Sequence, residues 1–194
     1  MKLILASTSK FKSKILNTTG LKHTNIESNF KEESKNYNDV YKYVKDLSFG
    51  KAKSVEDKIN DGIILSLDTV VYVDGIILEK PKTLEEAKNN LRLCSGNTSY
   101  VITGITLINK YNNEIITDCV STKIILRKIS ESDIDYYIEN EPSILHVSGF
   151  VFETMVSNFL DKIEGSYYNI LGIPTETIYK HLNSWGITLK DLEN

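Results

Sequence analysis

The chain opens on an apolar run, Lys2-Leu3-Ile4-Leu5-Ala6, which three hydroxyl residues follow, Ser7-Thr8-Ser9. The run has no polar alternation, which favours a strand buried on both faces of an α/β sheet. After Ser9, apolar residues recur at helical spacing as far as Gly20, so we expect Ser9 to cap a helix and Gly20 to end it. The stretch therefore predicts a strand, a tight loop and a helix.

The rest of the chain continues to alternate strands with helices. Gly62 to Leu67 repeats the all-apolar pattern and places Asp68 at its carboxyl end. Asp74-Gly75, between two apolar runs, has the chemistry of a two-residue hairpin turn. Further strands are predicted at residues 22–30, 98–109, 114–127, 159–163 and 167–171, the last two as a hairpin, and further helices at residues 40–59, 83–95, 130–141 and 174–185. This alternation predicts an α/β protein with a mixed sheet, as one domain over residues 1–194.

Composition limits the classes of function. The 194 residues are 41% hydrophobic, enough for an ordinary core, and carry 26 acidic against 23 basic side chains. This balance lacks the positive field of a nucleic-acid coat protein, so no nucleic-acid partner is expected. Cys94 and Cys119 have no CxxC partner, which excludes a thiol-built zinc site and a disulfide scaffold. The first apolar run is too short for a signal peptide or a membrane span, so we expect a cytoplasmic protein without a membrane partner.

Three segments could carry chemistry. The segment from Ser7 to Lys12 joins a buried strand to a helix N-terminus, where free N–H groups and the helix dipole favour an anion such as phosphate; alternatively, its serines only cap the helix. Asp68-Thr69 follows a buried strand, where the carboxylate could hold a divalent cation or accept a proton from water, or could simply form a turn. Lys80 precedes Pro81, which stiffens the backbone and aims the side chain, although a surface lysine is the simpler interpretation.

Taken together, short motifs match one family pattern almost from end to end. They are Leu3 to Ser9, Asp68-Thr69-Val70-Val71, Asp74-Gly75, Leu78-Glu79-Lys80-Pro81, Glu86-Ala87, Leu93-Cys94-Ser95-Gly96, Ile163 to Asn169 and Gly172-Ile173-Pro174. In this order and spacing the chain resembles the Maf family, the nucleotide pyrophosphatases named for septum formation inhibitors.

The resemblance implies a fold similar to the inosine-triphosphate pyrophosphatases: an elongated mixed β-sheet flanked by helices, with two lobes around a central cleft, in a homodimer. The implied reaction converts a nucleoside triphosphate and water to the monophosphate and pyrophosphate, with a divalent cation, Mg²⁺ or Mn²⁺. By matched position Asp68 would accept the proton and, with Glu32, contact the metal. Lys12, Lys51 and Lys80 would face the phosphates; the remaining phosphate-loop contacts would be Ser7 and Ser9.

The chain departs from the family pattern after Ser9. The family's proline and arginines are replaced there by Lys10, Phe11, Lys12 and Ser13. Lysine supplies the charge without the bidentate fork of arginine, so a looser hold on the phosphates is expected.

Three positions bear on the base. The Maf branch that acts on dTTP and UTP carries arginine, threonine and glutamine where this chain has Phe11, Thr69 and Glu153, and the branch that acts on 7-methyl-GTP carries tryptophan, glutamine and glutamate. An aromatic face at 11 could stack on a base, and an ionised Glu153 suits the N–H donors of guanine. Thr69 matches the pyrimidine branch instead. We expect some preference for methylated or modified purine triphosphates, unless Phe11 and Glu153 are ordinary core and surface residues.

Two other functions fit the same residues. One is a catalytically weak nucleotide-binding regulator of cell division, because the substituted phosphate loop could have lost turnover. The other is an inosine-triphosphate pyrophosphatase, a related family whose phosphate-loop motifs differ. His23, His146 and His181 share no ligand spacing and are expected to be structural or surface residues, although His146 could line the cleft.

Overall fold

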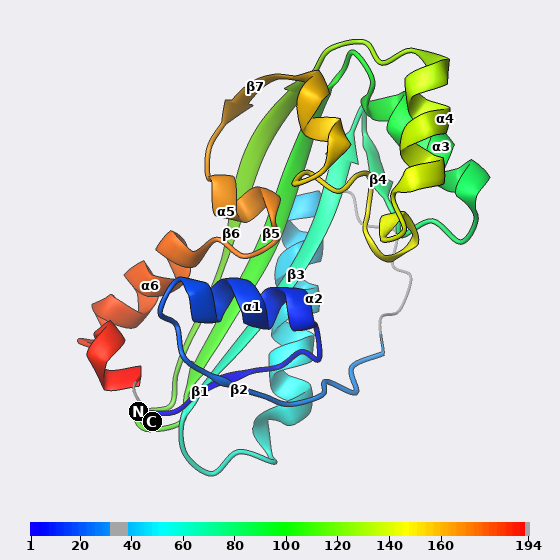
Figure 1. Cartoon of the computed structure of the whole chain (residues 1–194). Coiled ribbons are helices and arrows are strands. Elements are labelled where there is room, and N and C mark those ends of the chain that lie inside the picture. Colours follow the sequence, from blue (N-terminus) through cyan, green and yellow to red (C-terminus); the bar gives the residue numbers. More distant parts are fainter. Residues whose placement is uncertain (32–38, 193–194) are drawn as a thin grey trace. The chain divides into compact units, whose positions relative to one another are not determined.

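The computed structural model describes residues 1–31 and 39–192, and the chain divides into two compact units (Figure 1). The first unit comprises Met1–Thr69, Thr103–Val120 and Gly172–Asn194, and the second comprises Val70–Ile102 and Ser121–Leu171. Within the described ranges, no helix has the length and hydrophobicity that crossing a membrane requires.

Strands and helices alternate as the sequence predicts. The strands are β1 (Leu3–Leu5), β2 (Thr24–Asn25), β3 (Ile63–Val73), β4 (Ile76–Leu78), β5 (Thr98–Asn109), β6 (Glu114–Leu126) and β7 (Leu160–Glu164). The α-helices are α1 (Lys10–Thr18), α2 (Val40–Glu56), α3 (Leu84–Cys94), α4 (Glu131–Asn140), α5 (Tyr167–Ile170) and α6 (Thr175–Ser184), and the 3₁₀ helices are η1 (Ile144–His146), η2 (Met155–Phe159) and η3 (Leu189–Leu192). In the described part of the chain the strands pair in the order β2-β1-β3-β5-β6-β7, with β4 on β3.

In the first unit β1 is the inner strand of a parallel trio. It pairs with β2 on one side and with β3 on the other, where Leu3 faces Ile63 and Leu5 faces Leu65. Both strands are apolar at every position in this stretch and are buried on both faces, as predicted.

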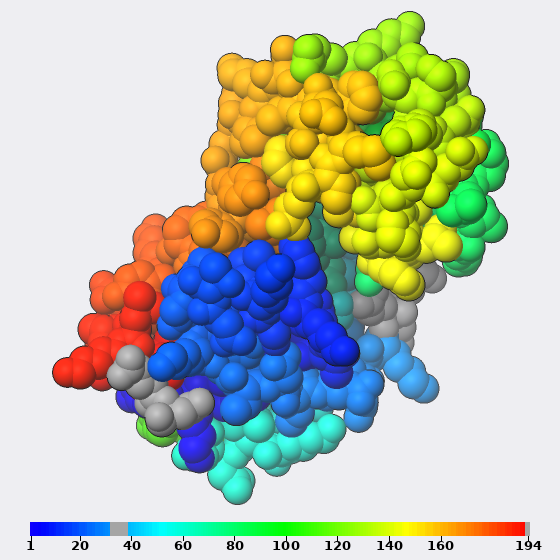
Figure 2. All heavy atoms as spheres, viewed as in Figure 1, coloured from blue at the N-terminus to red at the C-terminus, as the bar shows by residue number. Residues whose placement is uncertain are grey.

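Successive strand residues point to opposite faces of the sheet, and helices cover both faces of the first unit. Ile63 and Leu65 pack with α1 and α6 in one hydrophobic cluster, whereas Ile64 packs with α2 in another. The first cluster also holds residues of η3, so the beginning and the end of the chain share one core, and their atoms adjoin at the surface in Figure 2, in blue and red. The sheet is therefore fixed between α2 and the pair α1 and α6.

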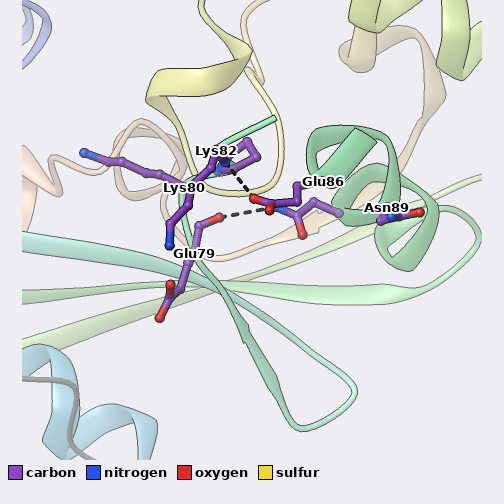
Figure 3. Close-up of a pocket in the computed structure, with 7 residues that line it drawn as sticks. Glu79, Lys80, Lys82, Glu86 and Asn89 are labelled. Carbon is purple, nitrogen blue, oxygen red and sulfur yellow. Dashed lines mark hydrogen bonds between the residues drawn. The ribbon is translucent and has the colours of Figure 1, made fainter. Parts of the chain in front are cut away.

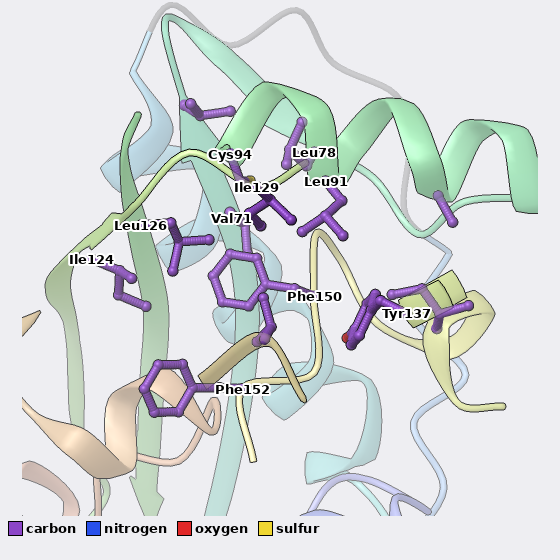
Figure 4. Close-up of a cluster of buried hydrophobic side chains, with 14 of the residues drawn as sticks. Val71, Leu78, Leu91, Cys94, Ile124, Leu126, Ile129, Tyr137, Phe150 and Phe152 are labelled. Atoms are coloured by element: carbon purple, nitrogen blue, oxygen red, sulfur yellow. The ribbon is translucent and has the colours of Figure 1, made fainter. Parts of the chain in front are cut away.

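The second unit has its own core, made by β3, β4, the ends of β5 and β6, and helices α3 and α4 (Figure 4). The turn between β3 and β4 uses Asp74 and Gly75, both at positive φ (48° and 83°), as the predicted two-residue hairpin requires. The phenol of Tyr137 is buried in this core and its oxygen accepts a hydrogen bond from the Val151 amide at 2.8 Å. This bond satisfies a polar group that would otherwise cost free energy.

Three predicted elements differ. The strand expected to end at Leu67 continues to Val73, because the apolar residues after Thr69 extend it into the hairpin with β4, so Asp68 lies within β3 and not at its carboxyl end. The hairpin expected at residues 159–171 is wrong: β7 pairs with β6 and is followed by helix α5, because Ser166 caps that helix by accepting from the Asn169 amide at 3.0 Å. The strand expected at residues 22–30 is only the two-residue β2. The α/β class with a mixed sheet is confirmed, while the single domain and the cleft between two lobes stay predictions.

Candidate functional site

The loop between β1 and α1 is organised by its serines. Ser9 caps α1, because its hydroxyl accepts from the Lys12 amide at 3.3 Å. The Ser9 amide in turn donates to the hydroxyl of Ser7 at 3.2 Å, and the Ser7 amide donates to the Leu5 carbonyl at 2.8 Å. The loop backbone is thus held from within, and the prediction that Ser9 begins the helix is confirmed.

The same loop leaves donors for a ligand. Within residues 1–31 and 39–192, the amide N–H groups of Thr8, Lys10 and Phe11 have no hydrogen-bond acceptor. They lie at the N-terminus of a nine-residue helix that has no acidic residue in its first turn. Unpaired amides and the positive end of a helix dipole together favour an anion, so this geometry suits a phosphate group.

Lys12 lies on α1, beyond the carboxyl end of β1, and Asp68 lies in the middle of β3. The Lys12 ammonium donates to the Leu67 carbonyl oxygen at 2.9 Å, one residue before Asp68. This contact places a positive charge of the phosphate loop beside the strand that carries the carboxylate. The structure therefore brings the loop of Ser7, Ser9 and Lys12 to the strand that carries Asp68, and the roles of these residues stay predictions.

Asp68 is a nearly buried carboxylate with a fixed partner. It is 9% exposed, and its Oδ1 accepts a hydrogen bond from the ammonium of Lys51 on α2, with which it forms an ion pair. In the part of the chain that the structure describes, Oδ2 of Asp68 has no hydrogen-bond donor. One oxygen is thus held by the protein, and the other has capacity for a proton, a water molecule or a metal ion.

Thr69 begins the part of β3 that follows the carboxylate. Its Oγ1 lies 3.0 Å from Oγ1 of Thr103 on β5 and donates to the Gly172 carbonyl at 3.4 Å. Gly172 has a φ of +74°, and a Cβ there would lie 2.9 Å from Oγ1 of Thr69, so glycine is required on both counts. With its hydrogen donated to Gly172, the Thr69 hydroxyl accepts from Thr103 and has one further lone pair for a ligand donor.

A divalent cation fits the donor set in part. Across the described ranges, no three His, Cys, Asp or Glu side chains gather in metal-binding geometry. Mg²⁺, however, is bound by only one or two carboxylates together with water and substrate phosphates. Oδ2 of Asp68 would supply one such ligand, and Glu32, the second predicted ligand, lies outside the described residues.

Lys80 and Glu153 belong to the second unit. Lys80 lines a polar pocket of about 290 Å³ with Glu79, Lys82, Glu86 and Asn89 among its neighbours, and both lysine side chains extend away from α3 (Figure 3). The backbone there is fixed, because the Lys82 amide donates to Glu86 Oε2 at 2.7 Å. This bond fixes the backbone just after Pro81, and the aim of the Lys80 side chain stays a prediction. The positions of Lys80 and Glu153 relative to Asp68 stay predictions.

The two residues expected to read the base are both accessible in their own units. Phe11 is 43% exposed on α1, and Glu153 is exposed in the turn before η2. Neither is buried in a hydrophobic core, so the simple alternative of a core aromatic at position 11 is wrong.

The sequence did not single out Asn25, Ser13 or Lys82. Asn25 donates to the Ser7 carbonyl at 2.7 Å and accepts from the Ser13 hydroxyl at 2.9 Å. No local pattern marks these contacts, because they join residues 18 and 12 positions apart. For Lys82 the sequence offered one indication, its position two residues after Lys80 with Pro81 between them.

The histidines and cysteines have ordinary surroundings. His23 contacts the Ser13 hydroxyl, and His181 contacts the carboxylate of Asp118 at 2.9 Å. Cys94 is a buried free thiol, and Cys119 is a partly buried one.

Comparisons with known proteins show which family the chain belongs to. The model of the Maf-like protein family matches residues 2–185. A dTTP/UTP pyrophosphatase of Clostridium perfringens (strain SM101 / Type A) is 38% identical over 191 residues, which cover 97% of this chain and 100% of that protein. Another, from Thermosipho melanesiensis, is 36% identical over 92% of this chain and 95% of its own. The structure of the Staphylococcus aureus Ham1 protein matches with 10% sequence identity and a TM-score of 0.43, over 65% of this chain and 72% of the Ham1 chain. The chain belongs to the family of Maf-like proteins.

Proposed function

We propose that this chain is a nucleoside triphosphate pyrophosphatase that acts on dTTP and UTP, the substrates in the names of its full-length relatives. The observation that carries the proposal is the contact between the loop after β1 and the middle of β3. The loop has three unpaired amides, and its Lys12 ammonium contacts the carbonyl of Leu67, the residue before Asp68. This arrangement suits a polyphosphate on one side and an attacking water on the other.

Each group has a distinct task in the reaction. The loop amides and Lys12 bind phosphate oxygens and fix the triphosphate, and Lys80 adds a second cation. A water molecule attacks the α-phosphorus and gives up its proton to the Asp68 carboxylate. The bond from the α-phosphorus to the bridging oxygen breaks, and pyrophosphate leaves with the electron pair. Charge builds on the phosphoryl oxygens, and fixed donors stabilise it without a covalent intermediate.

Mg²⁺ or Mn²⁺ is the proposed cation, held by Oδ2 of Asp68 and by Glu32. When bound, it would neutralise charge on the phosphate oxygens. Lys51 is the residue that holds the Asp68 carboxylate in place for either task, through its ion pair on Oδ1.

The pyrimidine choice rests on Thr69 as well as on the relatives. Because the hydroxyl hydrogen of Thr69 faces Gly172, a lone pair remains for the N3–H donor that thymine and uracil share. Guanine presents an N1–H donor of the same kind, and Phe11 and Glu153 favour it. A purine preference is therefore the competing outcome of the test.

The test is pyrophosphate release from dTTP, UTP, GTP and 7-methyl-GTP with Mg²⁺ and with Mn²⁺. We expect the pyrimidines to be hydrolysed fastest, and Asp68→Asn to lower kcat/KM by about 10²- to 10⁴-fold. Asp61→Asn, an exposed aspartate that pairs with Lys2, is the matched control and should leave the rate unchanged. Faster hydrolysis of the purines refutes the pyrimidine assignment. Nucleotide binding without pyrophosphate release supports the non-catalytic regulator instead.

Two properties of the family are proposed as well. A homodimer predicts twice the mass of the 22.0 kDa chain in light scattering. A cytoplasmic location predicts recovery in the cytoplasmic fraction of the source cells.

A further inference from the structure

A chain of side-chain hydrogen bonds supports the Ser7–Ser9 loop from β2 and α1. Asn25, in β2, donates from Nδ2 to the Ser7 carbonyl oxygen at 2.7 Å. Its Oδ1 accepts from the hydroxyl of Ser13 on α1 at 2.9 Å. On the other side of that hydroxyl lies Nε2 of His23, also at 2.9 Å. All four residues lie in the first unit, where β2 runs beside β1 (Figure 1).

The orientation of the Asn25 amide follows from what its neighbours can donate. The Ser7 carbonyl oxygen only accepts, so the NH₂ group of Asn25 has to face it. The amide oxygen then faces the hydroxyl of Ser13, which donates to it. Nδ1 of His23 donates to the Leu21 carbonyl, so Nε2 of the neutral ring is a second acceptor for the same hydroxyl hydrogen. The Ser7 carbonyl therefore sets the orientation of the Asn25 amide, and Ser13 supports it with a hydrogen that it shares with His23.

The C=O of Ser7 and the N–H of Thr8 are the two polar groups of the same peptide bond. Both belong to one peptide group, which is planar and trans, so a fixed direction for the C=O fixes the opposite direction for the N–H. The Thr8 amide is one of the three loop donors without an acceptor in the described ranges. A hydrogen bond accepted at the carbonyl also polarises the peptide group and strengthens its N–H as a donor.

We propose that Asn25 is a positioning residue that aims the Thr8 amide at the substrate's phosphates, and that Ser13 supports the Asn25 amide through a hydroxyl hydrogen that it shares with His23. The inference rests on the proposed function for the identity of the substrate. It adds two residues outside the phosphate loop to the groups that determine how tightly the triphosphate is held.

The test combines binding and kinetics in full-length variants. Inorganic tripolyphosphate is the probe for binding, by titration calorimetry, and dTTP is the substrate for kinetics. For Asn25→Ala we expect tripolyphosphate affinity to fall and KM to rise by about 3- to 10-fold. For Ser13→Ala the loss is smaller, and Ser13→Thr, which keeps the hydroxyl, recovers the affinity. In each variant kcat changes less than KM.

This split separates positioning from a structural role. A variant that is merely less well folded lowers kcat through its active fraction and leaves KM unchanged. Asn17→Ala and Thr18→Ala, exposed residues of α1 that touch no loop residue, are the matched controls and should match the parent. Urea unfolding of every variant reports its stability independently.

The outcomes distinguish this inference from the proposed function. If Asn25→Ala binds tripolyphosphate as the parent does, or if the parent does not bind it, the positioning role is refuted. If the parent binds it, Asn25→Ala weakens that binding, and dTTP yields no pyrophosphate, the positioning role stands and the proposed function fails.

Discussion

Gly104 of β5 lies where helix α2 comes closest to the sheet. A Cβ at this position would lie 2.1 Å from the carbonyl oxygen of Val44, 2.4 Å from its carbonyl carbon and 2.9 Å from the Lys45 amide nitrogen. All three are backbone atoms of α2, so no side-chain rotation relieves the overlap. In Gly104→Ala, α2 has to move by roughly 1.4 Å, since the closest atom lies 2.1 Å away and non-bonded heavy atoms sit at about 3.5 Å.

The shift has two measurable effects. Overpacking of this kind lowers the free energy of unfolding by about 1–3 kcal/mol. Lys51 lies two turns along α2 and holds the Asp68 carboxylate, so the shift also misplaces the reacting group. A displacement of 1 Å at a catalytic group can cost about 10²-fold in rate. We therefore expect Gly104→Ala to lose both stability and kcat/KM for dTTP.

Urea unfolding and steady-state kinetics with dTTP measure the two effects. The double variant Val44→Ala/Gly104→Ala is the control: it trims the Val44 side chain and leaves the clashing backbone atoms, so it should not recover stability. The reasoning is refuted if Gly104→Ala unfolds within about 0.5 kcal/mol of the parent with unchanged kinetics.

Three further predictions test other contacts. Gly50→Ala places a Cβ 2.3 Å from the Phe30 ring and should lower the free energy of unfolding in urea. Because the clash is with a side chain, the double variant Gly50→Ala/Phe30→Ala should recover part of this loss, and no recovery would contradict the packing. Lys51→Met leaves the nearly buried Asp68 carboxylate without its ammonium partner and should lower the free energy of unfolding by about 3 kcal/mol. The double variant Lys51→Met/Asp68→Asn should lose less than the sum of the two single variants, and strict additivity would argue against the ion pair. Burial raises the pKa of the Cys94 thiol from 9.0 to about 11, so the unfolded chain loses this proton first and stability falls as pH rises across that window. Unfolding at about pH 8 and about pH 10 should show a smaller difference in Cys94→Ala than in the parent, and equal differences would contradict the raised pKa.

Local signals determined what the sequence could predict of the fold. Ser9 and Thr83 cap their helices, because each hydroxyl accepts a hydrogen bond from the backbone N–H three residues later. Asp74 and Gly75 form their turn through their own positive φ angles. Each of these depends only on neighbouring residues. The hairpin predicted near residue 167 is wrong because other contacts override the local β-propensity. The side-chain amide of the buried Asn169 donates to the Val101 carbonyl at 2.8 Å, and Ser166 caps the helix.

The candidate site divides in the same way. The loop before α1 could be interpreted as an anion site from strand and cap signals alone. Asp68 was a candidate from its place after an apolar run, and the family resemblance assigned Lys51 to the phosphates. The ion pair between Lys51 and Asp68 could be found only in the structure, since a contact between α2 and β3 leaves no local pattern. Asn25 could be found only in the structure, because its importance comes from one peptide group that it contacts across the fold.

The central claim is that water attacks the α-phosphorus of a nucleoside triphosphate beside Asp68. Hydrolysis of dTTP in ¹⁸O-labelled water, followed by mass spectrometry of both products, tests it most directly. The account predicts dTMP that carries the label and pyrophosphate that does not. Label in the pyrophosphate, or release of dTDP and inorganic phosphate, would contradict it.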